Sequence, residues 1–288
     1  MNPTVFFLII CLCISIVKSQ SSGLDVPFVP TPYEVVNGML DISQTGPQDT
    51  LYDLGCGDGR IVITAASKRG VKKAVGIDLD PQRIKECREN AKNAGVNKQV
   101  SFIQGDLFSI DFHQATVLTL YLLPDVNLKL RPKIFATLRP GTRVVSHDFD
   151  MGSWKADKEQ LAGSSYIYLW VVPANISGLW SWNLPDDPQN KVTTQINQQF
   201  QNITAKAYHN NNELKVSGIL INGSFFSISI NTQKSTDDSL PTTFIGTVED
   251  NQINGTSQSR YSESLPWTAA RDPSTIQNIA PEENVFPK

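Results

Sequence analysis

A glycine-rich turn directly after an apolar run is the strongest chemical signal in this sequence. An apolar run that ends in Asp53 leads to Gly55-Cys-Gly-Asp-Gly59, and a helical pattern over 61–66 comes next. Glycine lets the backbone turn tightly and lets a ligand approach the main chain closely. The pattern therefore predicts a buried strand, a ligand-binding turn and the start of a helix.

Aspartates surround this turn. Asp53 lies at the end of the apolar run, Asp58 lies inside the turn, and Asp78 and Asp106 follow the next two apolar runs. The glycine spacing also differs from the G-x-G-x-x-G pattern of dinucleotide sites, which hold a pyrophosphate at the helix N-terminus. A diphosphate would meet Asp58, and two like charges ~4 Å apart repel by about 4 kcal/mol at an effective dielectric near 20. S-adenosylmethionine (SAM) carries a sulfonium, an ammonium and a ribose instead, so the acids favour SAM.

The segment 53–59 resembles motif I of the class I SAM-dependent methyltransferases. Asp78 matches the ribose-binding acid of that family, and Asp106 matches its adenine-side acid. The resemblance covers about residues 26–173. It is closest to a subgroup that includes the mitochondrial protein-lysine methyltransferases, which pair a Val-Pro segment with D-L-G-x-G-D-G-R. The resemblance implies a set of SAM-binding residues: Asp53, Gly55, Cys56, Gly57, Asp58, Gly59, Asp78 and Asp106.

The surrounding pattern predicts the elements that position these residues. Apolar runs alternate with helical segments, giving strands 51–55, 74–79, 100–105, 115–121, 142–148 and 164–173 and helices 59–69, 81–94 and 125–137. This alternation with short connections predicts an α/β fold with a doubly wound, Rossmann-like parallel sheet over residues 24–173. Ligands bind at the carboxyl ends of the strands in such sheets, where the glycine turn, Asp78 and Asp106 fall.

The turn after the fourth predicted strand is where we expect the transfer chemistry. It reads Thr119-Leu-Tyr-Leu-Leu-Pro124, without the Asn- or Asp-Pro-Pro-aromatic tetrad usual in enzymes that methylate nucleobases. Tyr121 is the candidate catalytic residue, which would orient an acceptor amine, and packing in the core is its alternative role. His147 and Asp148 would serve as a base or as ordinary hydrogen-bonding groups.

Two further features bear on the substrate. Thr31 and Tyr33, after a proline-rich entry, would face the methionine end of the cofactor or belong to a surface linker. Residues 20–173 contain 17 basic and 17 acidic residues. The phosphate-backbone attraction that dominates nucleic-acid affinity therefore has no evident source, and we expect no nucleic-acid partner.

The N-terminus predicts export. Residues 5–17 form an apolar run of 13, shorter than the ~20 residues that span a bilayer, and Val17 and Ser19 precede a plausible cleavage point before Gln20. An uncleaved anchor is the alternative. Cleavage would leave two cysteines, Cys56 and Cys87, which we expect as free thiols because a disulfide would pin the glycine turn. Neither has a histidine or cysteine at metal-ligand spacing, so no metal site is predicted.

The composition changes after residue 173, where asparagine, glutamine, serine and threonine dominate and 7 basic residues face 11 acidic ones. Short alternating segments and the hairpin signal Asn222-Gly223 predict an antiparallel β domain over 176–272, a meandering sheet or small barrel, followed by a flexible tail over 273–288. The domain weakly resembles calycin-like barrels of secreted proteins, which begin at Gly-x-Trp and end at a motif like Trp267-Thr-Ala-Ala-Arg271. This region contains four N-glycosylation sequons, at Asn175, Asn202, Asn222 and Asn254. They would be glycan sites in a eukaryotic secretory route, and chance in an Asn-, Ser- and Thr-rich segment is the alternative.

Together these features predict a SAM-dependent methyltransferase that acts on a protein or small-molecule acceptor, and the resemblance makes protein lysine the first acceptor to test. SAM is made in the cytosol, so export raises an alternative: a catalytically silent SAM- or adenosine-binding module with a secreted β-barrel interaction domain. A small-molecule methyltransferase is a further alternative. We expect no membrane span after removal of the signal segment, and the sequence leaves the oligomeric state open.

Overall fold

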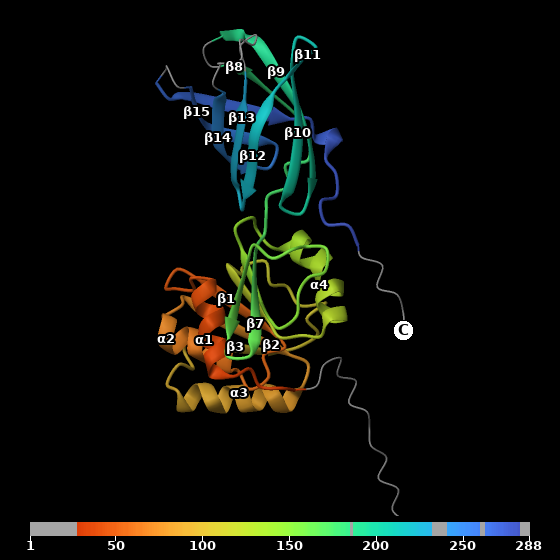
Figure 1. Ribbon diagram of the computed structural model, residues 1–288. Helices are drawn as coiled ribbons and strands as arrows, with labels where there is room; N and C mark the ends of the chain where they lie inside the picture. The colour runs from red at the N-terminus through yellow and green to blue at the C-terminus, as the bar shows by residue number, and fades with distance from the viewer. Residues whose placement is uncertain (1–27, 185–186, 232–240, 260–262, 283–288) are drawn as a thin grey trace, which may run out of the picture.

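The computed structural model describes residues 28–184, 187–231, 241–259 and 263–282. These residues form two β-sheets, one in an α/β part and one in a barrel-like part that lies above it in Figure 1. The predicted signal segment lies outside the described residues. Within those residues, no helix is long and apolar enough to cross a membrane.

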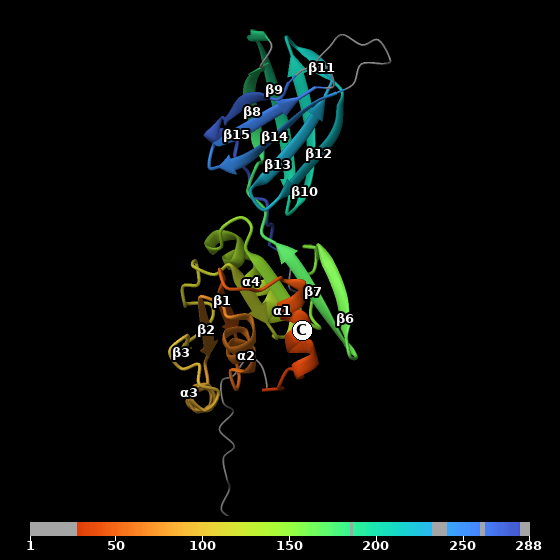
Figure 2. The ribbon, with the colours of Figure 1, turned by 90° about the vertical axis from the view of Figure 1, so that its left-hand side faces the viewer.

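The α/β part is built on a seven-stranded sheet in the order β3-β2-β1-β4-β5-β7-β6. Five strands are parallel: β1 (Thr50–Leu54), β2 (Lys73–Asp78), β3 (Val100–Gln104), β4 (Val117–Leu120) and β5 (Arg143–His147). β7 (Ser165–Val171) runs antiparallel to β5, and β6 (Lys158–Ala162) pairs antiparallel with β7 at the edge (Figure 2). The predicted α/β class with its doubly wound sheet is confirmed. The edge strand β6 was not predicted, because four of its five residues are exposed and give no apolar run.

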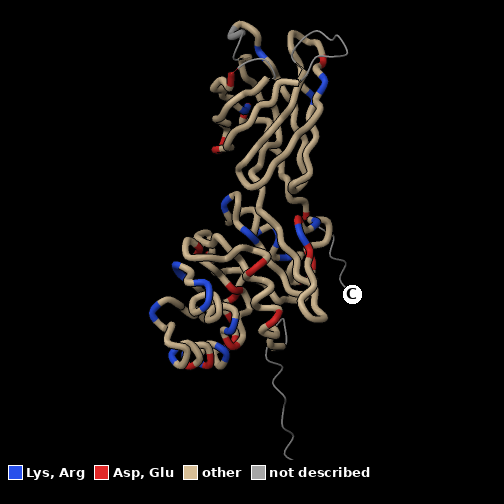
Figure 3. Tube along the Cα trace, turned by 60° about the vertical axis from the view of Figure 1, so that its left-hand side comes forward, with Lys and Arg blue, Asp and Glu red and all other residues tan. Residues whose placement is uncertain are grey.

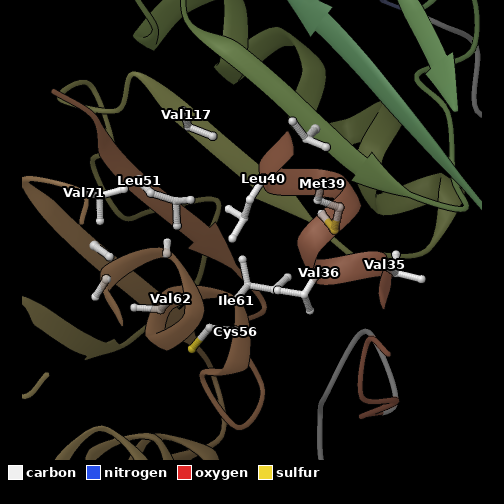
Figure 4. Packing of buried hydrophobic residues seen from close by; sticks show 14 of the residues in the cluster. Val35, Val36, Met39, Leu40, Leu51, Cys56, Ile61, Val62, Val71 and Val117 are labelled. Carbon is white, nitrogen blue, oxygen red and sulfur yellow. The ribbon is translucent and has the colours of Figure 1, made fainter. Parts of the chain in front are cut away.

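The helices cover both faces of this sheet: α1 (Tyr33–Ile42), α2 (Arg60–Arg69), α3 (Pro81–Asn93) and α4 (Pro124–Thr137). Successive strand residues point to opposite faces. Leu51 therefore belongs to the apolar cluster between the sheet, α1 and α2, which also contains Val36, Leu40 and Ile61 (Figure 4). Leu54, three residues later in the strand, points to the opposite face and packs in the apolar cluster that α4 covers.

The barrel-like part is a nine-stranded antiparallel sheet in the order β11-β10-β9-β8-β16-β15-β14-β13-β12. Its strands are β8 (Gly178–Leu184), β9 (Asp187–Gln199), β10 (Asn202–His209), β11 (Asn212–Leu214), β12 (Val216–Asn222), β13 (Phe225–Ile230), β14 (Thr242–Glu249), β15 (Gln252–Gln258) and β16 (Leu265–Arg271). β10 lies beside β12, so the sheet nearly closes around an apolar interior that includes Trp182, Phe244 and Trp267. Figure 3 shows few charged residues on it. The predicted antiparallel β fold is confirmed, and the calycin-like kinship stays a prediction.

The barrel meets the α/β part at the amino ends of the parallel strands. Gly223, in the predicted Asn222-Gly223 turn, has a left-handed φ of 57°. It lies so close to Gly141 that a Cβ added to Gly223 would be 2.9 Å from the Cα of Gly141. Gly141 precedes β5, and Ala174 N–H donates to the Gly223 carbonyl at 2.7 Å. Since the parallel strands run away from this junction, their carboxyl ends face away from the barrel (Figure 1).

The first part of the segment expected as a flexible tail makes contacts with the rest of the chain. A short 3₁₀ helix, Pro273–Thr275, is followed by residues that return to the α/β part. Ile279 and Ala280 are buried, and the Ile279 carbonyl accepts a hydrogen bond from Phe200 N–H at 2.8 Å. Arg131 of α4 donates to the Pro281 carbonyl at 2.7 Å. Ile279 and Ala280 therefore pack against the rest of the chain, and the last six predicted tail residues lie outside the described residues.

Candidate functional site

A pocket with a cavity volume of about 120 Å³ opens at the carboxyl ends of β1 to β4. All of its lining residues lie between positions 28 and 122, so the barrel contributes none. Eight of the nine predicted site residues line it: Asp53, Gly55, Cys56, Gly57, Asp58, Asp78, Asp106 and Tyr121. The ninth, Gly59, caps the start of α2 with a left-handed φ of 81°. The structure thus brings the glycine turn, the acids and the tyrosine into one cavity.

The glycine turn holds one acid in a fixed place. Gly55 and Cys56 N–H both donate to the Ile77 carbonyl at the end of β2, at 2.8 and 2.9 Å. Gly57 N–H then donates to a carboxylate oxygen of Asp78 at 2.8 Å. Gly57 has a left-handed φ of 56°, and an added Cβ would overlap the Phe28 ring. Only glycine lets the turn, Asp78 and the segment around Phe28 approach so closely.

Asp53 is the most deeply buried of the pocket acids, with 2% of its surface exposed. Its carboxylate accepts a hydrogen bond from Thr119 Oγ1 at 2.7 Å. Burial raises the pKa of Asp53 from 3.8 to about 7; the Thr119 hydrogen bond opposes this, and the charges of Asp78 and Asp58 add to it. A nearby cation would favour its ionised form, so Asp53 suits a positively charged ligand group.

Asp58 is already paired within the protein. Arg60 approaches its carboxylate at 2.6 Å and donates to both oxygens. Burial acts to raise the pKa of Asp58, but the hydrogen bonds and charge of Arg60 outweigh it and lower the pKa. The sequence argument used Asp58 as a charge that would repel a diphosphate and did not consider Arg60. Asp58 therefore gives a weaker preference for a cationic ligand than its place in the turn suggests.

Arg60 also anchors the N-terminal segment over the pocket. It donates to the Thr31 carbonyl at 2.8 Å, and its guanidinium lies 5.3 Å from the centre of the Tyr33 ring. Thr31 and Phe28 line the pocket, whereas Tyr33 does not and is 59% exposed. Of the two residues expected at the methionine end, only Thr31 lies at the cavity.

The turn after β3 presents Asp106 to the pocket. The carboxylate of Asp106 accepts hydrogen bonds from Phe108 N–H at 2.8 Å and Ser109 Oγ at 3.3 Å, which fixes the turn. Lys133 of α4 holds the same turn by donating to the carbonyls of Leu107, Phe108 and Ile110. Sequence reasoning missed this lysine, because it lies 27 residues beyond Asp106 and on a helix.

Tyr121 lies flat against His147. The two ring centres are 3.8 Å apart, and His147 is 1% exposed and does not line the cavity. His147 Nδ1 lies 3.3 Å from Thr31 Oγ1, and Nε2 lies 3.0 Å from Ser165 Oγ and 3.2 Å from Asp148. Burial lowers the pKa of His147 although Asp148 opposes it, so the imidazole is neutral at pH 7. His147 thus supports Tyr121 from behind, and its position does not fit a base that contacts an acceptor.

The two thiols lie behind the glycine turn. Cys56 Sγ and Cys87 Sγ are 3.8 Å apart and both are free, as expected. Cys87 Sγ donates to the Gly57 carbonyl at 3.1 Å, which ties α3 to the turn. Among the described residues, no group of three histidine, cysteine or acidic side chains is arranged to hold a metal.

Comparison with known proteins identifies the family. The model of the ANTKMT methyltransferase domain matches residues 53–158. A protein-lysine N-methyltransferase of Saccharolobus islandicus (strain REY15A) is 45% identical over 151 residues, which are 51% of this chain and 94% of that protein. The chain belongs to the class I SAM-dependent methyltransferases. It is therefore an enzyme, and SAM is its cofactor.

Two other relatives of this methyltransferase differ from each other in the acceptor that their names give. The adenine nucleotide translocase lysine N-methyltransferase of Mus musculus is 33% identical over 155 residues, 54% of this chain and 66% of that protein. The crystal structure of an RNA methyltransferase from Salinibacter ruber with S-adenosyl-L-homocysteine is 55% identical, with 50% of this chain and 93% of that chain covered and a TM-score of 0.49. Each of these similarities covers about half of this chain.

Proposed function

We propose that this methyltransferase acts on the side-chain amine of a protein lysine, and that the amine enters beside Tyr121. The observation that carries the proposal is the position of Tyr121, whose ring lines the donor cavity and rests on a buried neutral histidine. Burial and then the charge of Asp148 raise the pKa of Tyr121, so its hydroxyl stays protonated and able to hydrogen-bond an amine. The lysine methyltransferases among its relatives support the same acceptor.

The cavity offers each part of SAM a matching group. Asp78, held at the glycine turn by Gly57 N–H, would accept hydrogen bonds from the ribose hydroxyls. Asp106 and the apolar Leu107 would meet the adenine. Asp53 is buried and has a pKa of about 7, so a nearby cation can ionise it, and it would face the ammonium of the methionine end. The cofactor supplies a methyl group activated by its sulfonium.

The protein's own contribution is alignment and removal of a proton. A lysine must approach as a neutral amine, with its nitrogen ~3–3.5 Å from the methyl carbon, and such positioning supplies several kcal/mol. An apolar surrounding disfavours the ammonium form, and Leu122, Leu123 and Pro124 follow Tyr121 in the same turn. The proton released from the lysine passes to water at the open side of the pocket.

Transfer of radiolabelled methyl groups tests the acceptor. The full chain is incubated with labelled SAM and with protein or RNA fractions of cell envelopes, and the protein is hydrolysed to find methyl-lysine. Labelled methyl-lysine supports the proposal, and label confined to RNA overturns it. Micromolar SAM binding with label in neither fraction would count against an acceptor in the envelope. Asp78→Ala should abolish SAM binding, whereas Asp111→Asn, which changes an exposed carboxylate outside the cavity, should not.

Export is the second part of the proposal, and it is supported by the apolar run 5–17 and by the sequons. The side chains of Asn202, Asn222 and Asn254 are exposed on the barrel, which suits glycosylation. Asn175 is less suited to carry a glycan, because its side-chain amide donates to the Gln277 carbonyl at 2.8 Å and accepts from Ser177 Oγ. Mass spectrometry of the enzyme from its own host tests both features. An N-terminus at Gln20 supports export, and a retained Met1 contradicts cleavage.

A further inference from the structure

An acidic and aromatic surface lies beside Tyr121, on the loop after β5 and on the β6–β7 hairpin. We call it the acidic shelf, and it consists of Asp148, Phe149, Asp150, Glu159, Tyr166 and Tyr168. The hairpin forms the edge of the sheet farthest from β3 (Figure 2). The Phe149 ring stacks on Tyr121 with centres 6.2 Å apart, so the shelf begins at the wall of the donor cavity.

The loop that carries two of the acids is held in place by the hairpin. Asp148 adopts a left-handed φ of 59°, which is uncommon for a residue other than glycine. Its N–H donates to the Tyr166 carbonyl at 2.8 Å, and Tyr166 N–H donates to its carboxylate at 2.9 Å. Asp150 fixes the next turn by accepting from Gly152 N–H at 3.0 Å. The acids are thus presented by a defined backbone.

The hairpin adds aromatic rings and a third acid on one face. Glu159 of β6 is opposite Tyr168 of β7, and the rings of Tyr166 and Tyr168 stack with centres 6.1 Å apart. Tyr166 is 49% exposed and Glu159 is exposed. Burial raises the pKa of Tyr168, and the charges of Glu159, Asp150 and Asp148 add to this, so all three acids act on one ring.

The opposite face of the hairpin is occupied by the protein itself. Ala162 and Ile167 point to α1, where Gly38 leaves them room. Side chains alternate along a strand, so Lys158 belongs to this other face, next to Gln160 and away from Glu159. The shelf face is therefore the one on which carboxylates and tyrosine rings lie beside Tyr121.

We propose that the acidic shelf binds a positively charged, extended segment of the acceptor protein, so that the enzyme prefers a lysine flanked by further lysines or arginines. This inference rests on the proposed lysine acceptor. Three carboxylates in one patch attract cationic side chains, and the exposed ring of Tyr166 beside the half-buried ring of Tyr168 can hold them by cation–π contact. The barrel cannot supply this contact at the pocket, because it adjoins the opposite ends of the strands.

Binding of two peptides measures the shelf without requiring turnover. One synthetic peptide carries a central lysine flanked by arginines, the other carries the same lysine flanked by glutamates, and both are titrated against the full chain saturated with S-adenosylhomocysteine. We expect the arginine-flanked peptide to bind at least ~10-fold more tightly at low salt, with the difference shrinking as salt screens the charges. Equal binding of the two peptides would overturn the shelf.

Matched variants assign the effect to these residues. The double variant Asp150→Asn with Glu159→Gln keeps the side-chain shapes and an oxygen at position 150 that accepts from Gly152 N–H. It should weaken binding of the arginine-flanked peptide about 3- to 10-fold and leave SAM affinity unchanged. Glu34→Gln removes an exposed acid of α1 that lies against the turn of the hairpin on its other side, and should change little. If Glu34→Gln weakened peptide binding equally, the preference would come from the overall negative charge of the protein, and the proposed role of the acidic shelf would be wrong.

Turnover separates this inference from the proposed function. Methylation of both peptides with the same kcat/KM would leave the lysine acceptor standing and overturn the shelf alone. Charge-selective binding with no methyl-lysine in either peptide would overturn the lysine acceptor, and with it the preference proposed for that acceptor. An arginine-flanked peptide methylated with a lower KM and similar kcat supports both.

Discussion

Replacing Asp53 by asparagine tests the electrostatics of the cofactor pocket. The folded protein holds the Asp53 pKa at about 7, against 3.8 ordinarily, because the carboxyl group is buried. A pKa raised in the folded state means that ionisation destabilises the fold. The cost is absent below pH 3.8, grows as pH rises and levels off above pH 7. Since one pKa unit corresponds to 1.36 kcal/mol, the full cost is of the order of 4 kcal/mol.

The expected result is a difference between the pH slopes of two proteins. From pH 5.5 to pH 8, the ligand-free wild type should lose about 2 kcal/mol of unfolding free energy relative to Asp53→Asn. Asparagine keeps an oxygen that accepts from Thr119 Oγ1, so the variant should fold. Urea unfolding followed by the helical circular-dichroism signal is the assay, because the four described α-helices all lie in the α/β part.

Cofactor binding should favour the ionised form of Asp53, which the ligand-free fold disfavours, and Asp53→Asn removes this effect. A cationic group of SAM favours ionised Asp53, so binding at pH 6 should release a proton in the wild type and not in Asp53→Asn. Calorimetry in two buffers of different ionisation enthalpy measures this proton. Parallel stability slopes for the two proteins, together with no proton release, would refute the buried acid as a partner of the cation.

Three further changes probe the turn, the N-terminal segment and the barrel junction. Gly57→Ala should weaken SAM binding at least ~10-fold in calorimetry, because its left-handed φ is strained for alanine and its Cβ would meet Phe28. Arg60→Gln removes the donor to the Thr31 carbonyl and should make the N-terminal segment more sensitive to limited proteolysis. Gly223→Ala should lower the unfolding free energy by about 1–3 kcal/mol in a thermal scan without changing SAM affinity, since its Cβ would meet the backbone before β5.

Most of the donor site was open to prediction because its signals are local. A glycine with positive φ leaves a mark in the sequence, and Gly55, Gly57 and Gly59 all have φ between 56° and 81°. Parallel strands place their following turns at one sheet edge, so Asp78 and Asp106 converge once the alternation of strands and helices is recognised. Backbone sterics and sheet topology suffice for both conclusions.

The parts that sequence reasoning missed depend on contacts between distant residues or on exposed strands. The pairing of Arg60 with Asp58 decides the local charge, yet arginine at that position also fits a solvated helix start. The support of Tyr121 by His147 comes from two adjacent strand ends and becomes visible only in three dimensions. β6 carries exposed polar side chains, and only one residue of strand β10 is buried, so neither strand has the apolar run of a core strand.

The position of the barrel limits what it can do in catalysis. It meets the α/β part before β5, while Tyr121 and the acidic shelf lie after the strands β4 and β5. A five-residue strand rises ~3.3 Å per residue, so about 15 Å of sheet separates the two ends. A segment held only on the barrel therefore cannot place its lysine at the methyl group of the same molecule unless it also spans this distance. The acceptor must be selected mainly at the pocket mouth, and a barrel-binding partner would act by bringing the enzyme to its substrate.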